Sequence, residues 1–247
     1  MNIRVKVNYI KEKIKRTIFY KIYSQIKRSL SSQTQEDISK KEIKYLIKKD
    51  NPTILEIGCN DGKDSLEFLN QFKDIKLFCF EPDPRSIKKF NMKINDSRCC
   101  LNEIALSNKK GKIDFFLSES EIKEGEGADS SSLKKPKEHL EKFPWIKFKD
   151  KISVATDTLD NWTKKNKIDL IDFIWADVQG AEKELIEGGI KTLNKKTKYL
   201  YTEFYEKELY EGQIGLKKIL EMLPNYKIIK IYGNNVLLIN TMFGVNL

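Results

Sequence analysis

A short apolar run near the start of the chain ends in a turn that could bring a ligand close to the backbone. In Ile54-Leu-Glu-Ile-Gly-Cys-Asn-Asp-Gly62, the glycine at position 58 has no Cβ to keep a ligand away. Its Gly-x-x-x-Gly spacing differs from the Gly-x-Gly-x-x-Gly of dinucleotide sites, which makes a phosphate cradle less favoured. Glu81 follows Gly58 by 23 residues, and a carboxylate placed in this way can accept hydrogen bonds from both ribose hydroxyls. Together the two features predict a nucleoside ligand, whereas the alternative for Glu81 is a solvated acid at a strand end.

Acids and an amide also gather around the segment Ala176-Asp-Val-Gln-Gly-Ala-Glu182. Asp177 ends one apolar run and Glu203 ends the next, so both should reach the edge of a parallel sheet where ligands bind. There they could hold and deprotonate a hydroxyl, or bind Mg²⁺ through oxygen ligands. Gln179 and Glu182 are candidate contacts to the same acceptor, although Glu182 could instead cap the following helix.

The single histidine, His139, lies in a long polar segment. Because imidazole titrates near neutral pH, His139 is a candidate base or acceptor contact, and the alternative is an exposed loop histidine. The surrounding segment, 119–151, contains glycines, consecutive serines and two prolines and is too long for a passive connection in a compact domain. We expect a lid or acceptor loop there, with a surface excursion as the alternative.

Alternating strand and helix patterns are expected to position these side chains. Apolar, β-rich runs predict strands at residues 53–57, 76–80, 98–103, 171–176, 198–204, 226–231 and 236–240. Helical patterns occur at residues 38–49, 63–72, 84–94, 181–187 and 213–223. Such alternation predicts an α/β domain with a mostly parallel seven-stranded sheet and helices on both faces. A short Gly-Asn connection at 232–235 predicts that the last two strands form a terminal antiparallel hairpin.

The net charge of +10 is concentrated at the N-terminus and does not indicate a general nucleic-acid enzyme. Residues 1–30 hold nine Lys or Arg and one acid, so the remaining residues carry only +2 (10 − 8). The segment 1–34 has isoleucines four residues apart and a basic opposite face, which predicts an amphipathic helix and a linker. This helix could pack on the domain or on a second copy of the chain, or it could bind an anionic membrane surface. Residues 35–247 should form the α/β domain.

Cysteine usage and hydropathy favour a cytoplasmic protein. The four cysteines form no Cys-x-x-Cys pair and are typical of a reducing compartment. No uncharged run approaches the about 20 apolar residues needed to cross a bilayer, and no apolar stretch of a signal peptide follows the basic N-terminus. Attachment to the inner membrane face through the N-terminal helix is the alternative.

Several motifs resemble, in the same order along the chain, those of one enzyme family. Six segments are similar to motifs of the FkbM methyltransferases: Glu56-Ile-Gly-Cys-Asn-Asp-Gly62, Phe80-Glu-Pro-Asp83, Asn102-Glu-Ile-Ala-Leu-Ser107, Gly127-Ala-Asp-Ser-Ser-Ser132, Thr158-Leu-Asp160 and Ile174-Trp-Ala-Asp-Val-Gln-Gly-Ala-Glu182. The resemblance covers about residues 53–204 and implies a Rossmann-like class I methyltransferase fold that uses S-adenosylmethionine. Trp175 departs from the lysine common at that position, so no role is carried over for its side chain.

The resemblance also implies roles for individual residues. It places the methionine end of the cofactor at Glu56, Gly58 and Asn60. The ribose would lie at Glu81 and Pro82, and the adenine at Glu103, Ile104 and Ala105. It adds Ser131 and Ser132 to Gln179 and Glu182 as acceptor contacts. The implied reaction is methylation of a hydroxyl on a glycan or small-molecule acceptor, such as a sugar or a secondary metabolite. Two alternatives remain: an N-methyltransferase on nucleic acid or protein, although the chain lacks an Asn/Asp-Pro-Pro-Tyr motif, and a catalytically silent membrane-associated binding protein.

Overall fold

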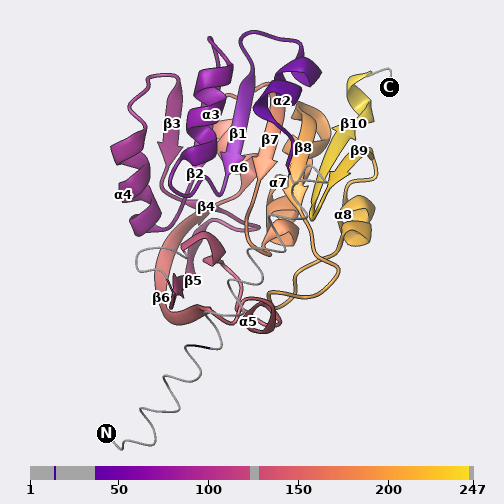
Figure 1. Ribbon diagram of the computed structural model, residues 1–247. Helices are drawn as coiled ribbons and strands as arrows, with labels where there is room; N and C mark the ends of the chain where they lie inside the picture. Colours follow the sequence, from indigo (N-terminus) through magenta and orange to yellow (C-terminus); the bar gives the residue numbers. More distant parts are fainter. Residues whose placement is uncertain (1–13, 15–36, 123–127, 245–247) are drawn as a thin grey trace, which may run out of the picture.

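Figure 1 shows the computed structural model, which describes residue 14 and residues 37–122 and 128–244. The amphipathic helix and linker predicted at 1–34 lie outside these residues, apart from Ile14. No helix in the described part of the chain is long and apolar enough to cross a membrane.

The domain is built on a seven-stranded sheet with the strand order β3-β2-β1-β7-β8-β10-β9. Its strands are β1 (Thr53–Ile57), β2 (Lys76–Phe80), β3 (Cys99–Asn102), β7 (Ile171–Ala176), β8 (Thr197–Glu203), β9 (Tyr226–Tyr232) and β10 (Asn235–Asn240). Neighbouring strands are parallel except at β10, which runs antiparallel to both β8 and β9. The predicted hairpin therefore forms, and its second strand inserts between β8 and β9. This topology confirms the Rossmann-like class I methyltransferase fold that the sequence predicts.

Helices cover both faces of the sheet, as predicted. One face packs against α2 (Lys40–Ile47), α3 (Lys63–Gln71) and α4 (Pro84–Lys93), and the other packs against α6 (Leu159–Lys165), α7 (Glu182–Lys196) and α8 (Leu216–Met222). Within β1, Ile54 faces the first group of helices, whereas Leu55 and Ile57 face the second. Burial on both faces explains why the central strands are continuous apolar runs.

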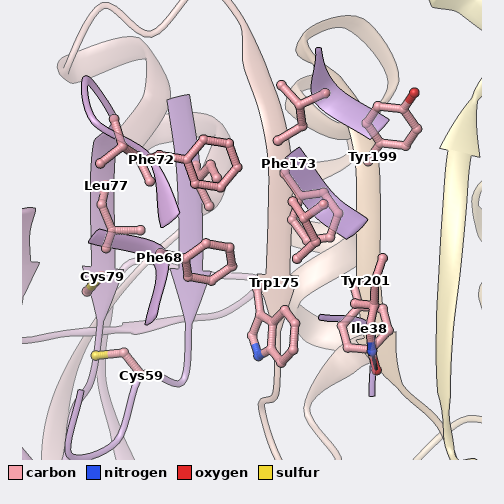
Figure 2. Close-up of a cluster of buried hydrophobic side chains, with 14 of the residues drawn as sticks. Ile38, Cys59, Phe68, Phe72, Leu77, Cys79, Phe173, Trp175, Tyr199 and Tyr201 are labelled. Atoms are coloured by element: carbon pink, nitrogen blue, oxygen red, sulfur yellow. Dashed lines mark hydrogen bonds between the residues drawn. The ribbon is translucent and has the colours of Figure 1, made fainter. Parts of the chain in front are cut away.

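The face beneath α2 and α3 is filled by aromatic side chains, which Figure 2 shows. The Trp175 ring meets Phe68 edge-on, with centroids 5.9 Å apart, and it lies 4.6 Å from the Tyr201 ring. The ammonium of Lys40 stands 3.3 Å from the centre of the Trp175 ring and pairs with Asp64 at 2.7 Å. In this chain Trp175 is therefore a core side chain that carries a buried cation.

Helix α7 extends beyond the range that the sequence predicts, because Gly188 and Gly189 interrupt the helical pattern of the sequence but not the helix itself. The prediction ends at residue 187, whereas the helix continues to Lys196. A Cβ on Gly188 would stand 2.0 Å from the carbonyl oxygen of Ser107, and one on Gly189 would stand 2.8 Å from Leu159. Close packing thus requires glycine inside a helix, where it otherwise costs about 1 kcal/mol.

A second, three-stranded sheet takes up both ends of the predicted lid. It consists of β4 (Ala105–Leu106), β6 (Ile146–Asp157) and β5 (Gly111–Ser120), in that order. The segment 119–151 is therefore not one long loop, and it contains the short helices η1 (Ala128–Ser130) and α5 (His139–Lys142) between its strand ends. The strands β5 and β6 have no clear pattern in the sequence, because many of their positions are exposed and charged, which weakens the apolar signal of a strand.

Candidate active site

The turn after β1 is shaped by its packing against β7. Gly58 has φ +87°, and a Cβ there would stand 1.8 Å from the backbone carbonyl oxygen of Asp177. The backbone N–H of Asp177 also donates to the carbonyl of Ile57 at 2.9 Å. The contact between two strand ends therefore requires glycine here, a reason that the sequence did not reveal.

Glu81 joins the turn after β1 to the turn after β2. Its Oε2 accepts a hydrogen bond from the backbone N–H of Asn60 and its Oε1 accepts one from Asp83, each at 2.9 Å. The residue is only 6% exposed. Burial raises the pKa of Glu81 to about 7, and the two hydrogen bonds oppose this rise. A carboxylate that ionises near neutral pH is thus held at this strand end.

The two turns open into a pocket of about 640 Å³, including the solvent space at its mouth. Nine of the predicted site residues line it: Gly58, Asn60, Glu81, Pro82, Ile104, Ala105, Ser131, Asp177 and Gln179. Phe115 and Leu133 extend the apolar wall around Ala105, and Asp129 adds a carboxylate. No local pattern in the sequence marks these three residues as part of the site, because only the folded second sheet and the segment that follows it bring them to the pocket.

Two of the predicted cofactor residues lie elsewhere. Glu56 is 1% exposed and accepts a 2.5 Å hydrogen bond from the Ser65 hydroxyl, beneath α3. Burial raises the pKa of Glu56 to about 8, so this acid is protonated at neutral pH. Glu103 is exposed and is not part of the pocket wall. Because Glu56 lies within β1 and not at its end, its side chain points into a helical layer, and the structure does not support its predicted contact with a cofactor.

The predicted acceptor serines attach the segment predicted as a lid to the rest of the site. Ser131 Oγ accepts hydrogen bonds from the backbone N–H of Ser118 at 3.0 Å and from Arg85 Nη2 at 3.2 Å. Ser132 Oγ donates to the backbone carbonyl of Gln179 at 2.6 Å. Ser131 lines the pocket and Ser132 does not. Both hydroxyls therefore have partners within the protein, which indicates a structural role.

Asp177, Gln179 and Glu203 come together at the ends of β7 and β8. Gln179 Nε2 donates to Asp177 Oδ1 at 2.6 Å and lies 3.5 Å from Glu203 Oε2. The Asp177 side chain is exposed to the pocket. Because the surrounding protein limits the hydration of its carboxylate, the pKa of Asp177 is raised to about 6. Burial and the neighbouring Asp177 raise the pKa of Glu203 well above its usual value. Both carboxyls therefore titrate above their usual range, and Asp177, with a pKa of about 6, is largely ionised at neutral pH.

The predicted Mg²⁺ site does not fit this geometry. The Gln179 amide nitrogen, a hydrogen-bond donor, lies between Asp177 and Glu203 where a cation would have to bind. The described residues contain no group of three or more acidic, histidine or cysteine side chains arranged to hold a metal ion. Since Mg²⁺ prefers six oxygen ligands in a regular octahedron, two carboxylates separated by an N–H donor are a poor site.

Glu182 and His139 lie outside the pocket wall. Glu182 Oε1 accepts the backbone N–H of Gly180 at 3.2 Å, and burial raises the pKa of Glu182 to about 8. This contact closes the turn before α7, and no side chain makes a cap hydrogen bond at the start of that helix, so the structure does not support the helix-capping interpretation. His139 is 2% exposed and packs against Phe143 and Tyr210. Burial lowers its pKa to about 4, so it is a neutral, enclosed side chain, which does not support its predicted contact with an acceptor.

The family model of the methyltransferase FkbM domain matches residues 56–229 of this chain. A curated relative, the 2-O-methyltransferase NoeI of Sinorhizobium fredii (strain NBRC 101917 / NGR234), is 42% identical over 197 residues. The alignment covers 79% of this chain and 81% of the relative. It therefore includes most of both proteins.

Solved structures with a similar fold are much more distant in sequence. An rRNA methylase from Streptococcus thermophilus is 11% identical with a TM-score of 0.43, and the alignment covers 81% of this chain and 93% of that one. The plantazolicin methyltransferase BpumL, solved in complex with SAH, is 16% identical with a TM-score of 0.42, with 88% and 74% covered. Likeness this distant says nothing about the acceptor.

Proposed function

Because the chain belongs to the FkbM methyltransferase family, we propose that it transfers a methyl group from S-adenosylmethionine to a hydroxyl oxygen of a sugar or glycan. The observation that carries this proposal is that Glu81 and Asp177, from two different strand ends, line one pocket. The first suits a ribose, and the second suits a hydroxyl that must lose its proton.

The pocket residues fit the chemistry of S-adenosylmethionine. Each oxygen of Glu81 accepts one backbone hydrogen bond and has a lone pair left for a ribose hydroxyl. Ile104, Ala105 and Phe115 supply an apolar wall for a purine. The acids Glu81 and Asp177 give the pocket a negative field, which favours a positively charged cofactor over its neutral product.

Asp177 is the residue placed to receive the acceptor proton. When bound, S-adenosylmethionine supplies an electrophilic methyl group on a positively charged sulfur. Asp177 is largely ionised at neutral pH and open to the pocket, so its carboxylate can accept the proton of a hydroxyl. Gln179 holds Oδ1 at 2.6 Å and thereby limits the rotation of the carboxylate. Alignment of the hydroxyl by these side chains supplies most of the remaining catalysis.

The proposed acceptor class rests on the relative. Its printed name, 2-O-methyltransferase, denotes transfer to an oxygen at a numbered position. Molecules with several numbered hydroxyls include sugars and glycans, and 42% identity over most of both chains supports the same kind of acceptor here.

Methyl-labelled S-adenosylmethionine can test the proposal directly. The full-length protein is incubated with the labelled cofactor and, separately, with mono- and oligosaccharides, RNA and a protein mixture. We expect label in an O-methyl group of a saccharide, located by mass spectrometry of the derivatised sugar. Label only on nitrogen in RNA or protein would reject the proposal in favour of an N-methyltransferase. Absence of label from every saccharide would also count against it.

A further inference from the structure

Gln179 lies in a tight turn and is held there by contacts to Ser132, Asp177 and Tyr210. Its backbone has φ +49°, which is uncommon for a residue with a side chain. The Ser132 hydroxyl donates to its carbonyl at 2.6 Å, and the amide nitrogen donates to Asp177 at 2.6 Å. The other side-chain polar atom, Oε1, lies 3.0 Å from the hydroxyl of Tyr210.

Tyr210 comes from the loop after β8 and is packed so that its hydroxyl has little freedom. The residue is 1% exposed. Its ring fills the space beside Gly180, where a Cβ would stand 2.8 Å from ring and side-chain carbons of Tyr210. Its hydroxyl also lies 2.8 Å from the carbonyl oxygen of Ser130, and its backbone bridges to Pro136. Tyr210 therefore touches both the lid and the turn that carries Gln179.

The phenolic proton helps to decide which way the Gln179 amide faces. The hydroxyl has one proton, which the Ser130 carbonyl oxygen at 2.8 Å and Gln179 Oε1 at 3.0 Å share as acceptors. A donor on this side favours the orientation in which Oε1 faces Tyr210 and the NH₂ group faces Asp177, where an ionised carboxylate needs a donor. If the amide turned over, its oxygen would face the carboxylate and repel it. Without the phenolic O–H, both faces of the amide become accessible, and Asp177 loses its fixed partner for part of the time.

We propose that Tyr210 is a positioning residue for methyl transfer, because its hydroxyl fixes the Gln179 amide that orients the Asp177 carboxylate. This inference rests on the proposed function of the same pocket. Tyr210 does not line the pocket, so it acts through Gln179 and not on the substrate.

The test uses Tyr210→Phe, which removes the hydroxyl and keeps the ring beside Gly180. The matched control is Tyr226→Phe: Tyr226 is also buried, and its hydroxyl donates to the Leu193 carbonyl at 2.8 Å, on the α7 face of the sheet and outside the pocket wall. We expect Tyr210→Phe to lower kcat about 10-fold, the scale of one hydrogen bond, with KM and the affinity for S-adenosylhomocysteine within about twofold of the wild type. The control should keep kcat within about twofold.

A merely structural role would give a different pattern. If Tyr210 only held the lid, Tyr210→Phe would weaken S-adenosylhomocysteine binding, because Ser131 and Asp129 of the lid line the pocket. That result, or a kcat equal to that of Tyr226→Phe, would overturn the inference. The double variant Tyr210→Phe/Gln179→Leu should be no slower than Gln179→Leu alone, since both changes act on one contact.

An NMR measurement separates this inference from the proposed function, because it needs no acceptor. The side-chain amide signal of Gln179, assigned by its loss in Gln179→Leu, is recorded with S-adenosylhomocysteine present. Tyr210→Phe should shift this signal and speed its hydrogen exchange, whereas Tyr226→Phe should not. If the wild type methylates no saccharide but the signal responds in this way, the proposed function fails and the positioning contact stands. An unchanged signal in Tyr210→Phe would refute the contact itself.

Discussion

The half of the pocket around Glu81 and the half around Asp177 are held by different kinds of contact. Glu81 is fixed by backbone N–H groups of Asn60 and Asp83, in the turns that directly follow β1 and β2. Asp177 is oriented by a side-chain amide, which in turn depends on Tyr210 and on the lid. The first half is therefore a property of two local turns, whereas the second is assembled from segments far apart in the sequence. Substitutions should affect binding in the first half and turnover in the second.

Asp177→Asn should produce the largest effect. The variant keeps the shape of the side chain but removes its capacity to accept a proton, so we expect turnover to fall about 10²-fold or more, the usual scale for a lost base. Affinity for S-adenosylhomocysteine, measured by calorimetry, should stay within a few-fold of the wild type. Near-normal turnover on a verified acceptor would show that Asp177 is not the base. The two halves of the pocket would then not differ in function as proposed, and catalysis would depend on alignment of the reactants alone.

Glu81→Gln should come next, and it should act on binding. One amide oxygen cannot accept both backbone N–H groups and the ribose hydroxyls, so we expect cofactor affinity at pH 8 to fall about 10- to 100-fold. Wild-type affinity should also decline as pH falls below about 7, where the carboxylate becomes protonated, and the variant should show no such decline. Titration calorimetry at pH 8 and pH 6 provides the check. An affinity equal to that of the wild type at both values would exclude Glu81 from the ribose contact.

Glu56→Gln should change stability without changing cofactor affinity, since Glu56 lies outside the pocket. Its pKa is about 8 in the folded protein and 4.5 in the reference state, so unfolding releases its proton across this range and wild-type stability falls as pH rises from 4.5 to 8. The Glu56→Gln variant has no carboxyl group to ionise, so its free energy of unfolding should exceed that of the wild type by a few kcal/mol at pH 8. At pH 4.5 the two proteins should differ little. Denaturant unfolding at both pH values measures the effect. A weakened cofactor affinity in this variant would restore Glu56 to the binding site.

Removal of divalent metal ions should leave turnover unchanged, which is the smallest effect expected. The Gln179 nitrogen occupies the space between Asp177 and Glu203, so turnover with excess EDTA should equal turnover with added MgCl₂. A loss of activity in EDTA that Mg²⁺ restores would show that the acceptor half is organised by a cation and that the amide must move.

The central strands, and the position of Glu81 and Asp177 at the pocket, follow closely from the sequence. The bounds predicted for β1, β2 and β7 coincide with those in the structure, because strands buried on both faces leave a clear apolar run. Glu81 and Asp177 lie at the pocket because the carboxyl ends of parallel strands meet at one edge of the sheet. The second sheet escaped prediction, since its exposed, charged positions hide the strand pattern.

The sequence by itself determined which residues stand at the strand ends, because apolar runs and glycine turns are local properties of the chain. Only the tertiary structure decided which polar side chains reach the pocket. It buried His139 among aromatic rings and placed Glu56 under α3, although both residue types suit catalysis. It also brought Tyr210 to Gln179 across 31 residues of chain. The physical reason is that side-chain direction and protonation depend on the layers packed around a residue, and distant segments supply those layers.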